Sequence, residues 1–410
     1  MFEVFLILFA LAFAALAWIN LRTAAWFVLA ALPAYLIRFT IGPVPFTVLE
    51  IMILIVLLVW LLRVHNFNKL TKDFAIPAAI LVVAATVGIF VAPDTVAALG
   101  IWKAYFIEPI LFYFVLRSLI SNRDHAHHAV IALGTGLFFI ALFALIQKFT
   151  GLAIPEPWDL TRRVSGVFGY PNALGLYVAP IVVLGFTALG VALRHRFVGL
   201  IGFWLVTLSL AIAAVIWSQT EAVWVALPIS LLAIATVSKW TRWWAVPASV
   251  IGIVLILAIP MIRGPVFEKI TLQDYSGGVR LAQWSETIEL VKDQPVFGAG
   301  LAGYPSAIEP YHQAEHIEIF QYPHNIFLNT WSELGLLGLI ALIWIAIEAL
   351  RLARVGLRRE DAPHWLVLGA TGALLVMFIH GLVDVPYFKN DLAVLSWSIL
   401  ALLSVSARTK

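Results

Sequence analysis

The stretch Y-P-H-N-I-F-L-N-T-W-S-E-L-G-L-L-G runs from Tyr322 to Gly338. Pro323 interrupts any preceding helix and a long apolar run follows, so a membrane helix is expected to begin just after His324. Polar groups at such a boundary are costly to keep near lipid, and an imidazole changes its charge near neutral pH. His324 and Asn325 are therefore functional candidates. The alternative is an interfacial histidine that only anchors a helix end.

The rest of the chain is apolar throughout. Of its 410 residues, 62% are hydrophobic and 12% are charged, and the mean hydropathy is +0.98, far above that of a soluble globular protein. Within lipid the backbone must satisfy its own hydrogen bonds, and the apolar runs have the length of spanning helices, about 17 to 22 residues. We predict one integral membrane domain over residues 1–410, an all-α polytopic fold with about 12 to 13 transmembrane helices.

The expected spans cover residues 2–19, 24–41, 46–62, 74–92, 96–116, 129–149, 171–192, 198–216, 220–237, 243–261, 326–348, 364–383 and 391–407. The first span is expected to be retained, because Glu3 takes the place of a basic signal-peptide segment and no small-residue cleavage site follows. The absence of cysteine excludes disulfides, thiolate metal sites and a cysteine nucleophile. The net charge of +3 is spread over short loops, so no nucleic-acid partner is expected.

Lysine and arginine gather in alternate loops. The loops after odd-numbered spans and the C-terminal tail carry many of them, whereas the loops near 42–45, 93–95 and 217–219 carry none. The positive-inside rule therefore places the odd loops and the C-terminus in the cytoplasm, and His324 outside. Basic residues that fall outside against this rule are candidates for a site, although a long loop can also carry charge freely: Arg162, Arg163, Arg263, Lys269, Arg280 and Lys292.

The long extracytoplasmic loop over residues 262–323 is expected to carry short helices and to cover a lateral site as a lid. After Gly277-Gly278 and before Pro295, the sequence V-R-L-A-Q-W-S-E-T-I-E-L-V-K predicts an amphipathic helix on the membrane face of a cavity. Its apolar face would consist of Leu281, Trp284, Ile288 and Val291.

Arg163, Arg280 and His324 suit a diphosphate ester at the membrane surface. Guanidinium groups bind phosphate oxygens in bidentate fashion and offset leaving-group charge, while a histidine accepts a proton from an acceptor hydroxyl or orients it. We expect the three side chains to line one cavity open to the outer leaflet. The alternative is that isolated loop arginines pair with lipid headgroups.

The stretch R-R-V-S-G-V-F-G-Y-P-N-A-L-G, from Arg162 to Gly175, leads into a span through several glycines. Glycines allow close backbone approach and leave amides free near a helix N-terminus, which attracts anions. The alternative is a turn in which Asn172 caps the helix.

The stretch H-Q-A-E-H contains His312, Glu315 and His316 at the spacing of a zinc protease helix. Pro310 just upstream and the lack of an evident third ligand count against it, so we predict no metal and no cofactor. Within spans, Lys103 and Glu108 are expected to pair. Asp384, after a span, is expected to orient His324 or an arginine, or to be a solvated helix end.

His324-Asn325 followed by Gly335-Leu336-Leu337-Gly338 resembles the signature of the O-antigen ligase family of membrane glycosyltransferases. The segments R-V-S-G-V-F-G-Y-P-N at 163–172, R-L-A-Q-W at 280–284 and D-Q-P-V-F-G-A-G at 293–300 are similar to other recurring segments of that family. The resemblance covers roughly residues 150–390. One departure is S-Q-T-E-A at 218–222, where many relatives have Ser-Arg-Gly.

The resemblance implies a metal-independent, inverting enzyme of the bacterial inner (cytoplasmic) membrane, with its site facing the periplasm or exterior. The donor would be an undecaprenyl-diphosphate-linked glycan and the acceptor a hydroxyl of a lipid, glycan or protein, among membrane lipids. His324, Arg163 and Arg280 are the expected catalytic residues. The expected substrate-binding residues are Arg162, Asn172, Asn325, Glu221 and Asp384.

Three other interpretations stay open at this point. O-antigen polymerases of the same superfamily differ chiefly in their acceptor, and Glu221 in the departing segment leaves acceptor identity undecided. A membrane transporter would also fit charged residues within spans, although transporters usually have internal repeats and broken helices at mid-membrane. A structural scaffold would tolerate changes at His324 and the arginines.

Overall fold

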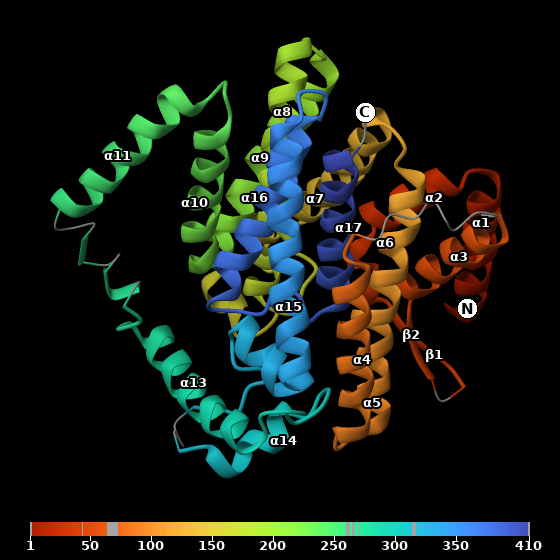
Figure 1. The fold of residues 1–410 in the computed structure, drawn as a ribbon, viewed down its shortest axis with the longest axis vertical. Helices are drawn as coiled ribbons and strands as arrows, with labels where there is room; N and C mark the ends of the chain where they lie inside the picture. The colour runs from red at the N-terminus through yellow and green to blue at the C-terminus, as the bar shows by residue number, and fades with distance from the viewer. Residues whose placement is uncertain are drawn as a thin grey trace.

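The computed structural model describes residues 2–42, 44–63, 73–259, 263–264, 267–269, 271–313 and 317–408. It confirms the predicted all-α polytopic membrane fold. The helices lie side by side in a bundle, with α13 and α14 at one end and the C-terminus at the other (Figure 1).

The first half of the chain forms α1 (Phe2–Ile19), α2 (Leu21–Ala30), the 3-10 helix η1 (Leu32–Leu36), β1 (Arg38–Ile41), β2 (Val44–Thr47), α3 (Val48–Arg63), α4 (Ala75–Val91), α5 (Thr95–Ile101), the π-helical η3 (Trp102–Ile107), α6 (Glu108–Leu119), α7 (Arg123–Thr150) and the 3-10 helix η4 (Trp158–Thr161). The second half forms α8 (Pro171–His195), α9 (Val198–Ser218), α10 (Glu221–Val237), α11 (Arg242–Ala258), α13 (Tyr275–Asp293), α14 (Tyr304–Ile308), the 3-10 helix η5 (Glu309–Tyr311), α15 (Ile326–Arg358), α16 (His364–Gly381) and α17 (Asn390–Arg408).

Eight helices in the described part of the chain are long and apolar enough to cross a membrane: Phe2–Ile19, Thr95–Leu119, Arg123–Thr150, Pro171–His195, Val198–Ser218, Ile326–Arg358, His364–Gly381 and Asn390–Arg408. Shorter apolar helices supplement them, among them Ala75–Val91 and Glu221–Val237.

The predicted span at 24–41 is wrong. The helix there ends at Ala30, because Pro33 opens a 3-10 turn and cannot continue the α-helical hydrogen bonding. The chain then forms the antiparallel hairpin of β1 and β2, in which Arg38 pairs with Thr47. The remaining predicted spans each correspond to a helix.

The core of the bundle is built around α17. Every residue from Asn390 to Ala407 is buried, and α17 packs against α6, α15 and α16. α8 in turn packs on α16 and α9. A helix that is apolar and buried on all sides belongs at the centre of a membrane bundle, so α8, α15, α16 and α17 are held in fixed positions relative to one another.

α11 stands at the edge of the bundle, away from α15 and α17 (Figure 1). Its apolar side chains are largely exposed, including Val250, Ile253 and Leu257. An apolar helix with such a surface fits a lipid environment. α11 lies beside α10, whereas α13 lies at the end of the bundle opposite the C-terminus (Figure 1). We call the segment between α10 and α15 the strap.

The amphipathic helix predicted after Gly277-Gly278 exists as α13, but two details are wrong. It begins earlier, at Tyr275, because Asp274 caps it by accepting a hydrogen bond from Gly277 N. Its buried face is also different. Polar Gln283, Glu286 and Thr287 are buried with Leu290 and Val291, whereas Leu281 and Ile288 of the predicted apolar face are exposed.

The buried face of α13 makes a small local core with the following turns. Leu290 packs with Tyr304 and Ile308 of α14, and Thr287 Oγ1 lies 2.9 Å from Tyr304 Oη. This packing leaves the exposed apolar side of α13 free to face lipid. The short helices predicted for the long loop are therefore present, but the buried face of α13 is not the predicted apolar face.

The predicted pair of Lys103 and Glu108 is also wrong. Lys103 Nζ lies 3.3 Å from Glu50 Oε1, because η3 winds with a π-helical turn that directs Lys103 toward α3 and β2. Among the described residues, neither carboxylate oxygen of Glu108 has a hydrogen-bond partner.

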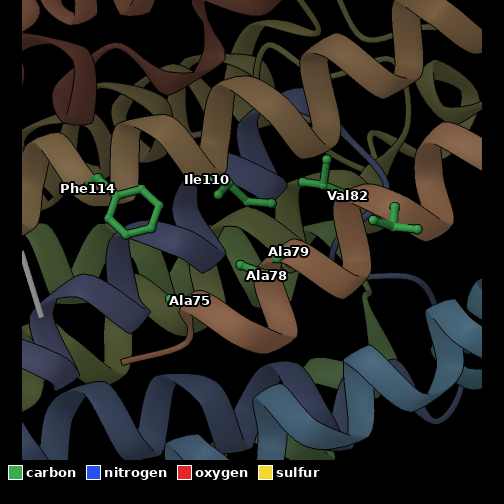
Figure 2. Close-up of a pocket in the computed structure, with 7 residues that line it drawn as sticks. Ala75, Ala78, Ala79, Val82, Ile110 and Phe114 are labelled. Atoms are coloured by element: carbon green, nitrogen blue, oxygen red, sulfur yellow. The ribbon is translucent and has the colours of Figure 1, made fainter. Parts of the chain in front are cut away.

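An apolar groove runs between α4 and α6. Figure 2 shows the small side chains of α4 opposite Ile110 and Phe114 of α6. No polar side chain lines it, and none of the predicted site residues belongs to it: its lining is Ala75, Ala78, Ala79, Val82, Val83, Ile110 and Phe114. In a membrane helix bundle such a groove is suited to a lipid chain rather than to group transfer.

Candidate functional site

His324 is fixed by the start of α15. Asn325 caps that helix, since its Oδ1 accepts hydrogen bonds from Phe327 N at 3.0 Å and Leu328 N at 3.1 Å. Its Nδ2 donates to Leu382 O at 3.0 Å, which ties the cap to the loop between α16 and α17. His324 itself has a left-handed backbone, with φ of 47°. Such a conformation costs an ordinary residue about 1–3 kcal/mol and is retained where the surroundings dictate it.

Gly335 explains the second part of the His-Asn motif. It interrupts α15 with φ of 65° and ψ of −169°, a conformation open to glycine. A Cβ atom there would lie 2.0 Å from Val296 O, and the next amide, Leu336 N, donates to that same oxygen at 3.1 Å. The glycine thus lets the segment 293–300 pack directly against α15, about three turns along that helix from His324.

Asp384 faces the imidazole of His324. The distance from His324 Nδ1 to Asp384 Oδ1 is 3.5 Å, long for a hydrogen bond, and their side chains are 19% and 2% exposed. His380 approaches the same carboxylate, with Nε2 3.9 Å from Asp384 Oδ2. Burial alone would raise the pKa of Asp384, but the facing histidines and the Val385 amide outweigh it and hold the pKa below its usual range.

Arg280 reaches the same loop from α13. Its Nε donates to Val383 O at 2.9 Å and its Nη1 to Ser276 O at 3.3 Å. Arg280 and His324 are therefore anchored on two consecutive residues, Val383 and Asp384. Residues more than forty positions apart in the sequence meet here because α16 ends at Gly381 and the loop that follows it lies within hydrogen-bonding reach of α13.

Arg163 lies between η4 and α8 in the sequence and contacts the first turn of α8. Its Nε donates to Ser218 O at 2.6 Å, and its Nη2 donates to Asn172 Oδ1 at 3.1 Å and to Gln219 O at 3.2 Å. The guanidinium also lies over the Trp158 ring, 4.9 Å from its centroid. Partial burial lowers the pKa of Arg163, against the opposing effect of Glu221. The guanidinium stays charged, since its ordinary pKa is above 12.

Both readings of the glycine-rich stretch before α8 are wrong in part. The amides of Ser165 and Gly166 are not free, because both donate to Gln147 Oε1. Asn172 does not cap the helix either: Tyr170 is the N-cap residue, without a side-chain bond, and Asn172 accepts from Arg163 instead. Gly166 allows close packing against Ile140 of α7 and Gly175 against Thr220 before α10, and Asn172 positions the arginine.

Two tyrosines connect the Arg163 side of the site to His324. Tyr170 Oη lies 3.0 Å from Tyr322 Oη, and the Tyr322 and His324 rings are 4.9 Å apart between centroids. Phe320 packs on the other side of the imidazole at 5.2 Å. Burial, reinforced by Asp384, raises the pKa of Tyr322 well above its usual range, so its hydroxyl stays protonated. Both tyrosines were missed by sequence reasoning, although each precedes a proline in a recognised motif.

Glu221, at the start of α10, binds the strap rather than standing free. It pairs with Lys269, whose Nζ also lies 2.7 Å from Asp274 Oδ2 at the cap of α13. Desolvation alone would raise the pKa of Asp274, but the hydrogen bond and charge of Lys269 and the Gly277 amide together outweigh it and lower the pKa. Through Lys269 and Asp274, Glu221 thus links the start of α10 to the start of α13.

Arg162 points away from this site. Its Nη1 donates to Phe149 O at 3.1 Å, at the end of α7, and its carbonyl accepts from Lys148 Nζ at 3.4 Å. It therefore shares no partner with Arg163.

The zinc motif is not supported by the described part of the chain. His312 follows η5 in extended backbone rather than on a helix. Its Nδ1 lies 3.2 Å from Glu286 Oε2 and its Nε2 lies 2.9 Å from Ile317 O. Glu315 and His316 lie outside the described residues. Within the residues described, no group of three or more histidine and acidic side chains gathers in a way that could hold a metal.

Fold and site together define a polytopic all-α membrane protein in which a half-buried histidine faces a buried aspartate and an arginine is bound to the same loop. Residues 205–343 match the O-antigen ligase family. That region contains Glu221, Arg280 and His324, whereas Arg163 and Asp384 lie on either side of it. The resemblance predicted from the motifs is confirmed.

Two curated relatives match over more of the chain. One is an exopolysaccharide production protein, ExoQ, of Rhizobium meliloti (strain 1021), 27% identical over 309 residues that cover 66% of this chain and 67% of the relative. The other is an uncharacterized protein of Haemophilus influenzae, 27% identical over 279 residues that cover 58% and 69%. The matches support an O-antigen ligase/polymerase-type membrane enzyme.

Proposed function

We propose that this protein transfers a glycan from an undecaprenyl-diphosphate carrier to an acceptor hydroxyl at the outer face of the cytoplasmic membrane. The observation that carries the proposal is the meeting of Arg280 and His324 on consecutive residues, Val383 and Asp384, of one loop. This places a fixed cation beside a titratable imidazole backed by a buried carboxylate, as transfer from a diphosphate leaving group requires.

His324 is the proposed general base. With Nδ1 turned toward Asp384, Nε2 is the nitrogen that takes the proton of the acceptor hydroxyl. The acceptor oxygen forms a bond to the anomeric carbon from the face opposite the diphosphate, so the configuration inverts. The bond from that carbon to the phosphate oxygen breaks, and its electron pair remains on the diphosphate.

Arg280 and Arg163 are the proposed diphosphate ligands. A guanidinium offers two parallel donors to phosphate oxygens and keeps its charge at any physiological pH. Arg163 is positioned by Asn172, and Asn325 positions His324 by capping α15. Glu221, paired with Lys269, and Arg162, which points away from this site, are given no part in the reaction.

The test compares His324→Ala with Arg280→Lys in purified, full-length protein. With undecaprenyl-diphosphate-linked glycan as donor, His324→Ala should abolish transfer while donor binding stays near that of the wild type. Arg280→Lys should weaken donor binding, because a point-charged ammonium cannot reproduce the bidentate contact. Arg358→Lys, at the end of α15 far from this loop, is the matched control.

A well-folded His324→Ala protein that transfers glycan at a near-normal rate would rule out the role given to His324. It would also favour the transporter or scaffold reading, in which neither change separates chemistry from binding.

The similarity to an exopolysaccharide production protein favours a second candidate, a polymerase whose acceptor is another glycan. Incubation with the lipid-linked donor alone distinguishes the two. A polymerase extends one donor with another and gives a ladder of lengths, whereas a ligase leaves the donor intact until a lipid or protein acceptor is added.

A further inference from the structure

Lys389 is a cation of the site that neither the sequence motifs nor the proposed mechanism uses. It ends the loop between α16 and α17, the loop that holds Arg280 through Val383 and faces His324 through Asp384. Its ammonium lies over the Tyr170 ring, 4.4 Å from the centroid, and 5.7 Å from that of Phe168. The side chain is half-buried.

Within the described part of the chain, no carboxylate lies within ion-pair distance of Lys389 Nζ. Its chain neighbour Asp391 is fully buried, and neither of that carboxylate's oxygens has a hydrogen-bond partner there. Other outer lysines differ: Lys269 is paired with two carboxylates and Lys292 with Glu289 at 2.7 Å. Aromatic faces hold an ammonium in place without neutralising it. Lys389 is therefore held by ring faces and not by an ion pair within hydrogen-bonding distance.

The position of Lys389 relates it to both arginines and to the histidine. Tyr170, beneath its ammonium, is the N-cap of α8, the helix on which Asn172 holds Arg163. The hydroxyl of Tyr170 contacts that of Tyr322, whose ring packs on His324. Arg280 is bound six residues earlier in the same loop as Lys389. Lys389 is thus linked to Arg163 through the start of α8, to Arg280 through their shared loop, and to His324 through the two tyrosines.

We propose that Lys389 binds the diphosphate of the lipid-linked donor, and that its main effect is on the leaving group. This rests on the proposed function. A glycosyl diphosphate lipid carries two negative charges, and breaking the bond to the anomeric carbon leaves a diphosphate monoester that can carry three. The electron pair of that bond stays on the phosphate oxygen while the acceptor proton moves to His324. Arg163 and Arg280 match the first two charges, and Lys389 matches the one that develops.

The experiment measures binding of undecaprenyl diphosphate and of undecaprenyl monophosphate to the full-length protein in nanodiscs, with no acceptor present. Lys389→Met should weaken diphosphate binding by about tenfold, the usual scale of one charge-assisted contact, and weaken monophosphate binding less. Lys389→Arg should restore most of the loss. Lys292→Met, which removes a lysine already paired with Glu289, is the matched control and should bind like the wild type.

A second readout is transfer. Lys389→Met should lower kcat more than it raises KM for the donor, because the third charge appears as the bond breaks. A Lys389→Met protein with unchanged diphosphate binding overturns the role of Lys389, and so does an equal loss for both lipids. If the wild type transfers glycan in the transfer assay while Lys389→Met binds diphosphate normally, the proposed function stands without Lys389. If wild-type protein binds neither lipid and transfers nothing, both proposals fall.

Discussion

Asp384→Asn is the perturbation that tests the site most directly, because it removes one charge and almost no volume. Asp384 lies 3.5 Å from His324 Nδ1 and is 2% exposed. If His324 takes a proton during transfer, the carboxylate stabilises the imidazolium that forms. Asparagine keeps the shape and a dipole but loses that charge, so donor binding through the arginines should persist while the chemical step slows.

The size of the effect follows from the distance. Two unit charges 3.5 Å apart interact by about 5 kcal/mol at an effective dielectric constant of about 20. At about 1.4 kcal/mol for each factor of ten, this sets a ceiling of about three orders of magnitude. Because the asparagine dipole replaces part of the lost stabilisation, we expect kcat to fall by about 100- to 1,000-fold with little change in donor affinity.

The assay is single-turnover transfer with saturating lipid-linked donor, alongside equilibrium donor binding. Asp293→Asn is the matched control, since Asp293 accepts a hydrogen bond from Tyr311 Oη in the outer loop. A rate within about threefold of wild type for Asp384→Asn would refute the assigned role of the His324-Asp384 pair. A loss confined to donor affinity would refute it equally.

Stability against pH gives an independent check. The pKa of Asp384 is held below its usual range, so its ionised form is the one that the fold favours. The stability it contributes is complete above the unfolded pKa of about 3.9 and is lost as pH falls through the lower folded pKa. The part of the stability difference between wild type and Asp384→Asn that comes from the ionisation of Asp384 itself should therefore shrink only below about pH 4.

Two further predictions concern the backbone packing that supports the site and the groups that supply its positive charge. Gly335→Ala should destabilise the protein by about 1–3 kcal/mol and reduce transfer, because φ is 65° and the added Cβ would meet Val296 O. Thermal unfolding checks this against the control Gly252→Ala, where nothing lies within 4 Å of the added Cβ. Equal melting temperatures for the two variants would contradict the prediction. Transfer should persist in a chelator, because guanidinium groups carry the charge on the diphosphate; loss in EDTA that a divalent ion restores would instead support the H-Q-A-E-H motif.

Much of the fold could be predicted because its determinants are local. The length of each apolar run decides whether a helix forms in lipid, so the spans corresponding to α8, α9 and α16 were predicted almost to their ends. The failures have local causes that hydropathy does not measure. Pro33 ends the second helix early, and the apolar residues Leu281 and Ile288 of α13 stay outside because the buried side is occupied by Glu286 and Thr287.

The partners of the candidate side chains could not be predicted in the same way. His324, Arg163 and Arg280 were identified by their residue types, motifs and expected side of the membrane. That Arg163 binds Asn172, that Glu221 is tied to Lys269, and that Lys103 pairs with Glu50 instead of Glu108 follow from helix packing. Each such contact depends on rotations of helices about their axes, which sequence separation does not specify.

By itself, the sequence determined that this chain spans a membrane many times and which of its polar residues stand at helix boundaries, because water-to-lipid transfer free energies are properties of short segments. Only the tertiary structure decided which of those residues meet. The loop from Leu382 to Lys389 gathers Asn325, Arg280 and His324, and places Lys389 over Tyr170. Those contacts are set by the packing of α8, α13, α15 and α17 around one loop, and side-chain chemistry becomes a site only when packing fixes its distances.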